Sequence, residues 1–215
     1  MRPDDATTTR YAILGQLALR KWSAYELTKS MGRTLAWFWP RAESVIYAEA
    51  RRLVEQGYAK SRGEQAADGS ARTRTVYAIT PRGRKALREW LASDPATMSF
   101  ALEPLLRVHL ARFGTVEDLA RAVGWAERRA DDLLDVAETV ATEFAEGRHI
   151  FQQDAHFRGL LFNALWGLGI AVRDWARSAG AEIQSWKSIE GDDAARQRGI
   201  EAMVRAAKRR RRERT

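Results

Sequence analysis

Residues 37–53 read WFWPRAESVIYAEARRL, and this stretch decides how the N-terminal part of the chain folds. Three aromatic residues stand before Pro40, and a segment with helical periodicity follows it. Proline suits the first turn of a helix, because it has no amide hydrogen to leave unpaired there. Gly57 is a typical helix end. The pattern therefore predicts a helix from Pro40 to about Gln56.

This helix has two different faces. At 100° per residue, Ile46, Ala50, Leu53 and Gly57 fall within one narrow stripe with Ala42 close to it, and we expect this stripe to pack inward. The other side carries mainly small and cationic residues, with a tyrosine at its flank: Arg41, Ser44, Tyr47, Ala48, Arg51 and Arg52. Small groups where backbones come close and cations where phosphates lie suit the major groove of DNA. The same face also fits an ordinary solvated helix.

The segments on either side strengthen the first interpretation. Ser23 with Glu26 forms a capping-box pattern, which predicts a helix just before the aromatic residues. Downstream, YAKSRGE and TRTVYAIT predict two strands joined by a turn at Asp68–Gly69. Thr80 and Pro81 then begin a helix that runs to about Ala92.

Three helices, a hairpin and a further helix are the order of a winged helix-turn-helix domain. In such domains the third helix reads a groove and the hairpin, or wing, touches the flanking backbone. We predict groove contacts from Arg41 and Ser44. The predicted phosphate contacts are Tyr47, Arg51, Lys60, Arg62, Arg72 and Arg74. A winged helix that binds another protein is the alternative.

The first 92 residues closely resemble the PadR family of transcriptional regulators. The resemblance rests on YAILGQL (11–17), YEL (25–27), Phe38–Trp39 with Ile46–Tyr47 seven residues on, Leu53, Gly57 and VYAITPRGRKALREWL (76–91). Ala50 departs from the family, which usually has a larger aliphatic residue there. The resemblance implies a homodimeric DNA-binding repressor acting on a pseudo-palindromic operator. The helical remainder looks like the longer subgroup, which has a C-terminal dimerisation region.

Residues 93–99 (SDPATMS) read as a linker, and residues 100–190 read as helical. Apolar residues recur at steps of four and three in two long segments, which is typical of helices that pack along a seam. We predict that this seam joins two chains, although the two helices of one chain could also pack on each other. The predicted dimer residues are Leu119, Val123, Leu133, Val140, Phe157, Leu161 and Leu168. The weakly charged stretch 159–172 is shorter than the roughly 20 residues that span a bilayer, so we expect a buried helix and no membrane contact.

Charge is unevenly distributed over the chain. The net charge is +8 over residues 1–92 (17 basic, 9 acidic), −5 over residues 93–190 (10 and 15) and +5 over residues 191–215 (9 and 4). A basic head and a basic tail suit a polyanion, whereas the acidic middle does not. Residues 191–215 are predicted to be a flexible tail or a frayed helix. Their basic run either adds DNA affinity through counterion release or is a solvated end.

Other functions find less support in the sequence. The chain has no cysteine, which fits a cytoplasmic protein, and the polar N-terminus does not resemble a signal peptide. His109, His149 and His156 lack a metal-ligand spacing. We predict no cofactor and no enzymatic activity. Four aromatic residues either line an apolar slot for a small aromatic effector or simply pack in the core: Trp90, Phe162, Trp166 and Trp175. An effector-binding carrier is a further alternative.

Overall fold

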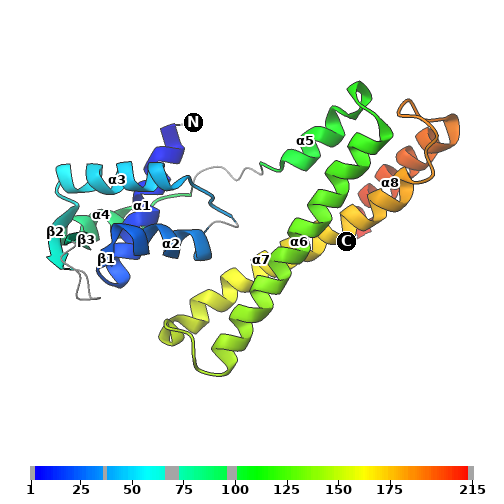
Figure 1. The fold of residues 1–215 in the computed structure, drawn as a ribbon. Coiled ribbons are helices and arrows are strands. Elements are labelled where there is room, and N and C mark those ends of the chain that lie inside the picture. The colour runs from blue at the N-terminus through cyan, green and yellow to red at the C-terminus, as the bar shows by residue number, and fades with distance from the viewer. Residues whose placement is uncertain (1–2, 36–37, 66–72, 96–100, 213–215) are drawn as a thin grey trace. The chain divides into compact units, whose positions relative to one another are not determined.

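The computed structural model describes residues 3–35, 38–65, 73–95 and 101–212 (Figure 1). The chain divides into two compact units, Met1–Ser99 and Phe100–Thr215. Both are mainly helical, and a small sheet lies in the first. The division falls between Ser99 and Phe100, directly after residues 93–99, for which the sequence predicts a linker.

The N-terminal unit is a winged helix-turn-helix, as the sequence predicts. Its elements are α1 (Pro3–Leu19), β1 (Trp22–Ser23), α2 (Ala24–Thr34), α3 (Glu43–Glu55), β2 (Ala59–Gln65), β3 (Thr73–Ile79) and α4 (Pro81–Leu91). The three strands form an antiparallel sheet in the order β1-β3-β2. The wing is the β2–β3 pair, in register from Ala59 opposite Ile79 to Gln65 opposite Thr73. Its predicted turn at Asp68–Gly69 lies outside the described residues.

Local capping begins the helices at the predicted residues. Ser23 Oγ accepts the backbone N–H of Glu26, and the Glu26 carboxylate accepts the N–H of Ser23 at 2.8 Å, which completes the capping box of α2. Thr80 Oγ1 accepts the N–H of Gly83 at the start of α4. Gly57, with φ of 73°, follows α3 in the left-handed conformation that glycine tolerates. These local signals fix where α2 and α4 start and where α3 ends.

Apolar side chains from α1, α2 and α3 make up the centre of this unit. Ile13, Leu14 and Leu17 of α1, Leu27 of α2 and Leu53 of α3 are at most 1% exposed. The first turn of α4 lies close against the segment after α3, because a Cβ on Gly83 would stand 2.1 Å from the carbonyl oxygen of Tyr58. A closed core of this kind holds α3 on α1 and α2.

The C-terminal unit is built around a long helical hairpin. Its elements are α5 (Glu103–His109), η1 (Ala111–Phe113), α6 (Val116–Ala145), η2 (Gln152–Asp154), α7 (Ala155–Ile183) and α8 (Asp193–Arg212). Helices α6 and α7 run side by side in opposite directions (Figure 1). Thr115 caps α6 in a capping box with Asp118. Gly147, with φ of 69°, follows the end of α6.

Helix α7 leaves much of its apolar surface uncovered. Among residues 159–172 only Gly169 is buried within the chain, where Leu134 lies 3.0 Å from the position of an added Cβ. The prediction of a buried helix is therefore wrong for the single chain. By length and composition alone, Gln152–Ile183 would also be able to cross a membrane, which a count limited to residues 159–172 did not reveal.

The basic C-terminal segment, for which a flexible tail or a frayed helix is predicted, forms the 20-residue helix α8. Asp192 caps it, since Oδ1 accepts the N–H of Ala195 at 2.7 Å. Arg198 Nε donates to both carboxylate oxygens of Glu182 in α7, at 2.9 and 3.2 Å. Its first turns are therefore tied to the end of α7.

Candidate nucleic-acid interface

The inward face of α3 matches the predicted stripe. Ile46, Ala50 and Leu53 are at most 3% exposed. Ala42 and Gly57 differ from the prediction, because they lie just before and just after the helix and are exposed. Helix α3 thus starts at Glu43 and not at Pro40. A proline is compatible with the segment just before a helix as well as with its first turn, so the sequence pattern did not separate the two.

A buried carboxylate that we did not predict also holds α3 in place. Glu49 is 5% exposed, and its two oxygens pair with Arg10 Nε of α1 at 3.2 Å and with Arg52 Nη1 at 3.1 Å. Removing one partner of a buried pair leaves a charge without compensation, which is costly. The signal was present in the sequence, because position 49 lies on the inward stripe between Ile46 and Leu53.

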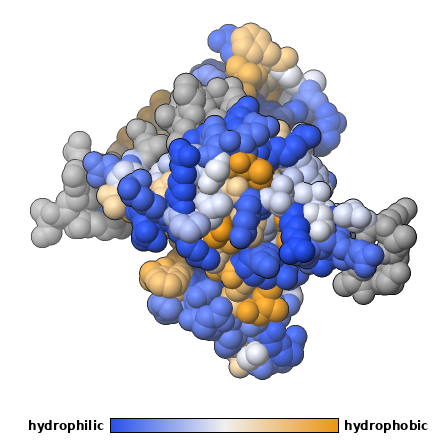
Figure 2. Space-filling model, turned by 90° about the vertical axis from the view of Figure 1, so that its left-hand side faces the viewer, coloured by the Kyte–Doolittle hydropathy of each residue, from blue (hydrophilic) through white to orange (hydrophobic). Residues whose placement is uncertain are grey.

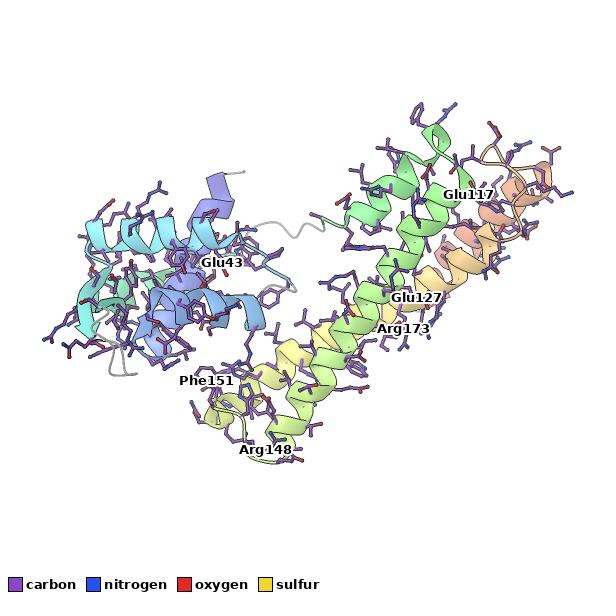
Figure 3. All side chains as sticks on the ribbon, viewed as in Figure 1. Glu43, Glu117, Glu127, Arg148, Phe151 and Arg173 are labelled. Atoms are coloured by element: carbon purple, nitrogen blue, oxygen red, sulfur yellow. The ribbon has the colours of Figure 1, made fainter. Side chains whose placement is uncertain are left out.

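The outward face of α3 is small near its start and cationic further on. Ser44, Ala48 and Arg51 are exposed, and Tyr47 is half-buried at the flank. Figure 3 marks the start of the helix by Glu43. Arg51 and Arg52 are neighbours in sequence but differ in role, because Arg52 is paired with Glu49 whereas Arg51 lies on the outward face. This arrangement can bring a helix backbone close to a groove.

Arg41 is tied to the protein and does not lie on α3. Its guanidinium stacks over the ring of Trp39, 4.3 Å from the centroid. Arg41 Nε donates to Thr9 Oγ1 at 3.1 Å, and Nη1 donates to the carbonyl oxygen of Pro40 at 2.7 Å. The helical position that we predicted for Arg41 is therefore wrong, and its contacts fix the segment before α3 to α1.

The wing carries cations on one face. Lys60 and Arg62 of β2 are exposed. The register places Arg62 opposite Val76 and Glu64 opposite Arg74, so Lys60, Arg62 and Arg74 share a face of the sheet. Arg74 is half-buried, and its Nε has no hydrogen-bond partner. Arg72 lies outside the described residues.

Two exposed residues at the start of α2 were not predicted. Tyr25 is 65% exposed, and Lys29 Nζ lies 5.5 Å from the centroid of its ring. In helix-turn-helix domains the helix before the reading helix crosses the DNA backbone. The capping box at Ser23 marks this helix start in the sequence and would have allowed Tyr25 to be found.

The capping carboxylate beside these residues carries charge at neutral pH. Hydrogen bonds from Ser23, chiefly that of its side chain, hold the pKa of Glu26 below its ordinary value, and the charges of Arg20 and Arg74 act in the same direction. The Glu26 carboxylate thus compensates the charges of Arg20 and of the wing residue Arg74. The face of the N-terminal unit that is turned to the viewer in Figure 2 is largely hydrophilic, with separate small apolar areas.

The four residues predicted for an effector slot are not gathered within either unit. Trp90 of α4 stacks on Tyr11 of α1, with ring centroids 4.9 Å apart. Phe162 and Trp166 stack on one another along α7 at 5.7 Å. Trp175 packs against the core that includes Leu119, Val123 and Ala176. The part of the chain that the structure describes contains no group of three or more residues able to hold a metal ion.

The predicted dimer residues separate into two sets. Leu119, Val123 and Leu133 of α6 are 5%, 1% and 8% exposed, because α7 of the same chain covers them; Val140 is half-buried. These three residues are therefore covered within their own chain, which is the alternative that the sequence left open. On α7, by contrast, Phe157 is 64% and Leu161 39% exposed, whereas Leu168 is half-buried. Glu127 and Arg173 mark the middle of the hairpin in Figure 3.

The core, the exposed reading helix and the basic hairpin define a winged helix-turn-helix domain. Residues 13–89 match the Transcriptional regulator PadR-like family. The match lies within the N-terminal unit, and it confirms for this unit the resemblance seen in the sequence.

Parts of this chain are similar to known proteins. The Negative transcriptional regulator PadR of Bacillus subtilis (strain 168) is 32% identical over 82 residues, which cover 38% of this chain and 44% of that protein. The match therefore spans less than half of the relative. The crystal structure of B. subtilis PadR in complex with operator DNA aligns with a TM-score of 0.65 at 20% identity, over 81% of this chain and 98% of that chain. Its complex with p-coumaric acid gives 0.59 at 19% identity, over 86% and 99%. These structures share the fold.

Proposed function

We propose that this chain is a cytoplasmic transcriptional regulator that binds double-stranded DNA and is not an enzyme. The observation that carries the proposal is the outward face of α3, where Ser44, Ala48 and Arg51 are exposed on a helix held by a closed core. The DNA-bound B. subtilis protein of the same fold supports it. In this proposal α3 enters the major groove, and Lys60, Arg62, Arg72 and Arg74 lie along the flanking phosphates.

Two chains are needed for the proposed regulator to reach two half-sites. Half-sites of a pseudo-palindromic operator lie about 34 Å apart, one turn of DNA. We assign the contact between chains to the exposed apolar face of α7, which includes Phe157, Leu160 and Leu161. A second copy that covers this face would account for its apolar character. We further propose that the regulator is a repressor, as the family resemblance implies.

A second chain explains α7 better than a bilayer does. Arg177 of α7 pairs with Glu127 at 2.8 Å and with Asp131 at 3.7 Å, both in α6. If α7 crossed a membrane with α6 beside it, these charges would have to enter or approach the hydrocarbon core, where they are expensive. In water the same pairs lie on the surface of the hairpin at little cost.

A small aromatic effector stays a prediction. The B. subtilis protein was solved with p-coumaric acid, and Phe162 with Trp166 is the stacked aromatic pair on α7 that would suit such a ligand. Trp90 and Trp175 already pack against other side chains. The rival functions are a winged helix that binds another protein and an effector carrier without specific DNA binding.

A gel shift with the DNA upstream of the chain's own gene tests the proposal. Wild-type protein should bind this duplex more tightly than a scrambled duplex of the same composition. Arg51→Ala should weaken binding to all sequences about equally and reduce the salt slope by about 1, because it removes one phosphate contact. Arg107→Ala is the control and should leave the salt slope unchanged, because this exposed arginine of α5 pairs with Glu103 and lies outside the winged helix. Equal affinity for both duplexes would reject specific DNA recognition in this region.

A further inference from the structure

Helix α8 concentrates positive charge at its C-terminal end. Its 20 residues include eight arginines and lysines and two acidic residues, Asp193 and Glu201. Both acidic residues lie in the first half, where they pair with Arg196 and Arg205. Residues 208–212 read KRRRR and contain no acidic residue. Six of the eight cations of α8 thus follow Glu201, the last acidic residue of the helix.

The start of α8 is anchored to the end of α7. Arg198 is bound to Glu182 of α7, and Trp186 Nε1 donates to the same carboxylate at 3.1 Å. From Arg198 to Arg212 the helix rises roughly 21 Å at 1.5 Å per residue. Residues 196–209 are all exposed. Lys208 and Arg209 are thus exposed on a helix whose first turns are tied to α7.

The charge per unit length of the basic run is similar to that of duplex DNA. Consecutive helical residues rise about 1.5 Å, so the basic run has one charge in about 1.5 Å, and a duplex has one phosphate charge per about 1.7 Å of axis. Like charges four residues apart repel and destabilise a helix. A bound polyanion would relieve this repulsion.

The pattern favours a polyanion over a membrane surface. A helix that lies in a bilayer interface needs an apolar face along its length. In α8 the large apolar residues are Ile200, Met203 and Val204, which are 52%, 68% and 45% exposed, and none follows Val204. Five consecutive basic positions are distributed all round a helix axis and leave no apolar face beside them.

We propose that the basic end of α8 is a second DNA-binding element, which binds the phosphate backbone of duplex DNA independently of sequence. The inference rests on the proposed DNA-binding function and adds a site outside the winged helix. Sequence is read by α3, and α8 adds affinity for any duplex that the chain approaches. Binding releases counterions, so the contribution of α8 should fall steeply with salt.

The test replaces Lys208, Arg209, Arg210, Arg211 and Arg212 together by glutamine in the full-length chain. Glutamine has a similar helix propensity, and circular dichroism checks the helix content. Binding is measured at several salt concentrations to the upstream duplex and to a 30-base-pair duplex of random sequence. The slope of log K against log salt should become shallower by about 2 or more, since each lost phosphate contact changes it by about 0.9. Affinity should fall by the same factor on both duplexes.

Arg196→Gln with Arg205→Gln is the matched control, because each of these cations has an acidic partner within α8; its slope should stay close to that of the wild type. A truncation after Ala207 should reproduce the quintuple variant if that variant folds poorly. An unchanged slope on both duplexes would overturn the inference. The inference would also be overturned if the quintuple variant lost binding to vesicles of phosphatidylserine and phosphatidylcholine but kept its affinity for both duplexes. Specific binding with an unchanged slope rejects only the α8 site, whereas a slope change without any specific binding rejects only the proposed regulator.

Discussion

The two units of the chain bury their apolar residues in different ways. In the N-terminal unit, Leu17, Leu27 and Leu53 are at most 1% exposed, so this unit completes its core by itself. In the C-terminal unit, Val123 is also buried, but Leu160 and Phe157 are 73% and 64% exposed. The first unit is therefore complete within one chain, whereas the second has an apolar face that is available to a partner.

The strongest test of this difference is within the hairpin. Val123 is 1% exposed in the seam between α6 and α7. Val123→Glu should destabilise the C-terminal unit by at least about 3 kcal/mol, because a carboxylate would be buried among apolar side chains without a partner. Chemical denaturation followed by circular dichroism measures the loss. Native-like stability in this variant would mean that the seam is not the core of the hairpin.

Leu161→Glu is the counterpart on the exposed face of α7. The side chain is 39% exposed, so a carboxylate there can remain in water within the single chain, and the hairpin should stay folded. The variant should be a monomer by light scattering, because two carboxylates would face each other in the proposed contact. Ser178→Glu, an exposed position of the same helix, should remain a dimer. A dimeric Leu161→Glu would exclude this face as the interface.

A smaller effect is expected in the N-terminal unit, at the buried carboxylate under α3. Glu49→Gln should destabilise this unit by about 1.5–3 kcal/mol, because it removes the charge from two hydrogen bonds to arginine. Hydrogen–deuterium exchange of the α3 amides reports on this unit alone. Glu55→Gln, at an exposed position of the same helix, should change exchange little. If both variants exchange alike, Glu49 does not hold the reading helix.

The parts of the fold that depend on neighbours in sequence were predictable. Ser23 with Glu26 and Thr80 with Pro81 begin helices through contacts within one turn, and the stripe of Ile46, Ala50 and Leu53 needs only helical spacing. These signals determined the winged helix and the inward face of α3.

The parts that depend on distant segments were not predictable in the same way. Spacing shows that the face of α6 with Val123 is buried, but not whether the same chain or a second one covers it. In the sequence, the position of Arg41 next to the reading helix suits a groove contact. Only its contacts with Thr9 and Trp39 in the structure show that it fixes the segment before α3. Strand β1 has two residues, too few for an alternating pattern.

The number of chains on one operator tests the central claim most directly, because it depends on both units. Sedimentation of the complex between wild-type protein and the duplex upstream of its own gene gives the mass of the bound species. The account predicts two chains on one duplex, each with its α3 in a major groove. A specific complex that saturates with one chain per duplex would contradict it.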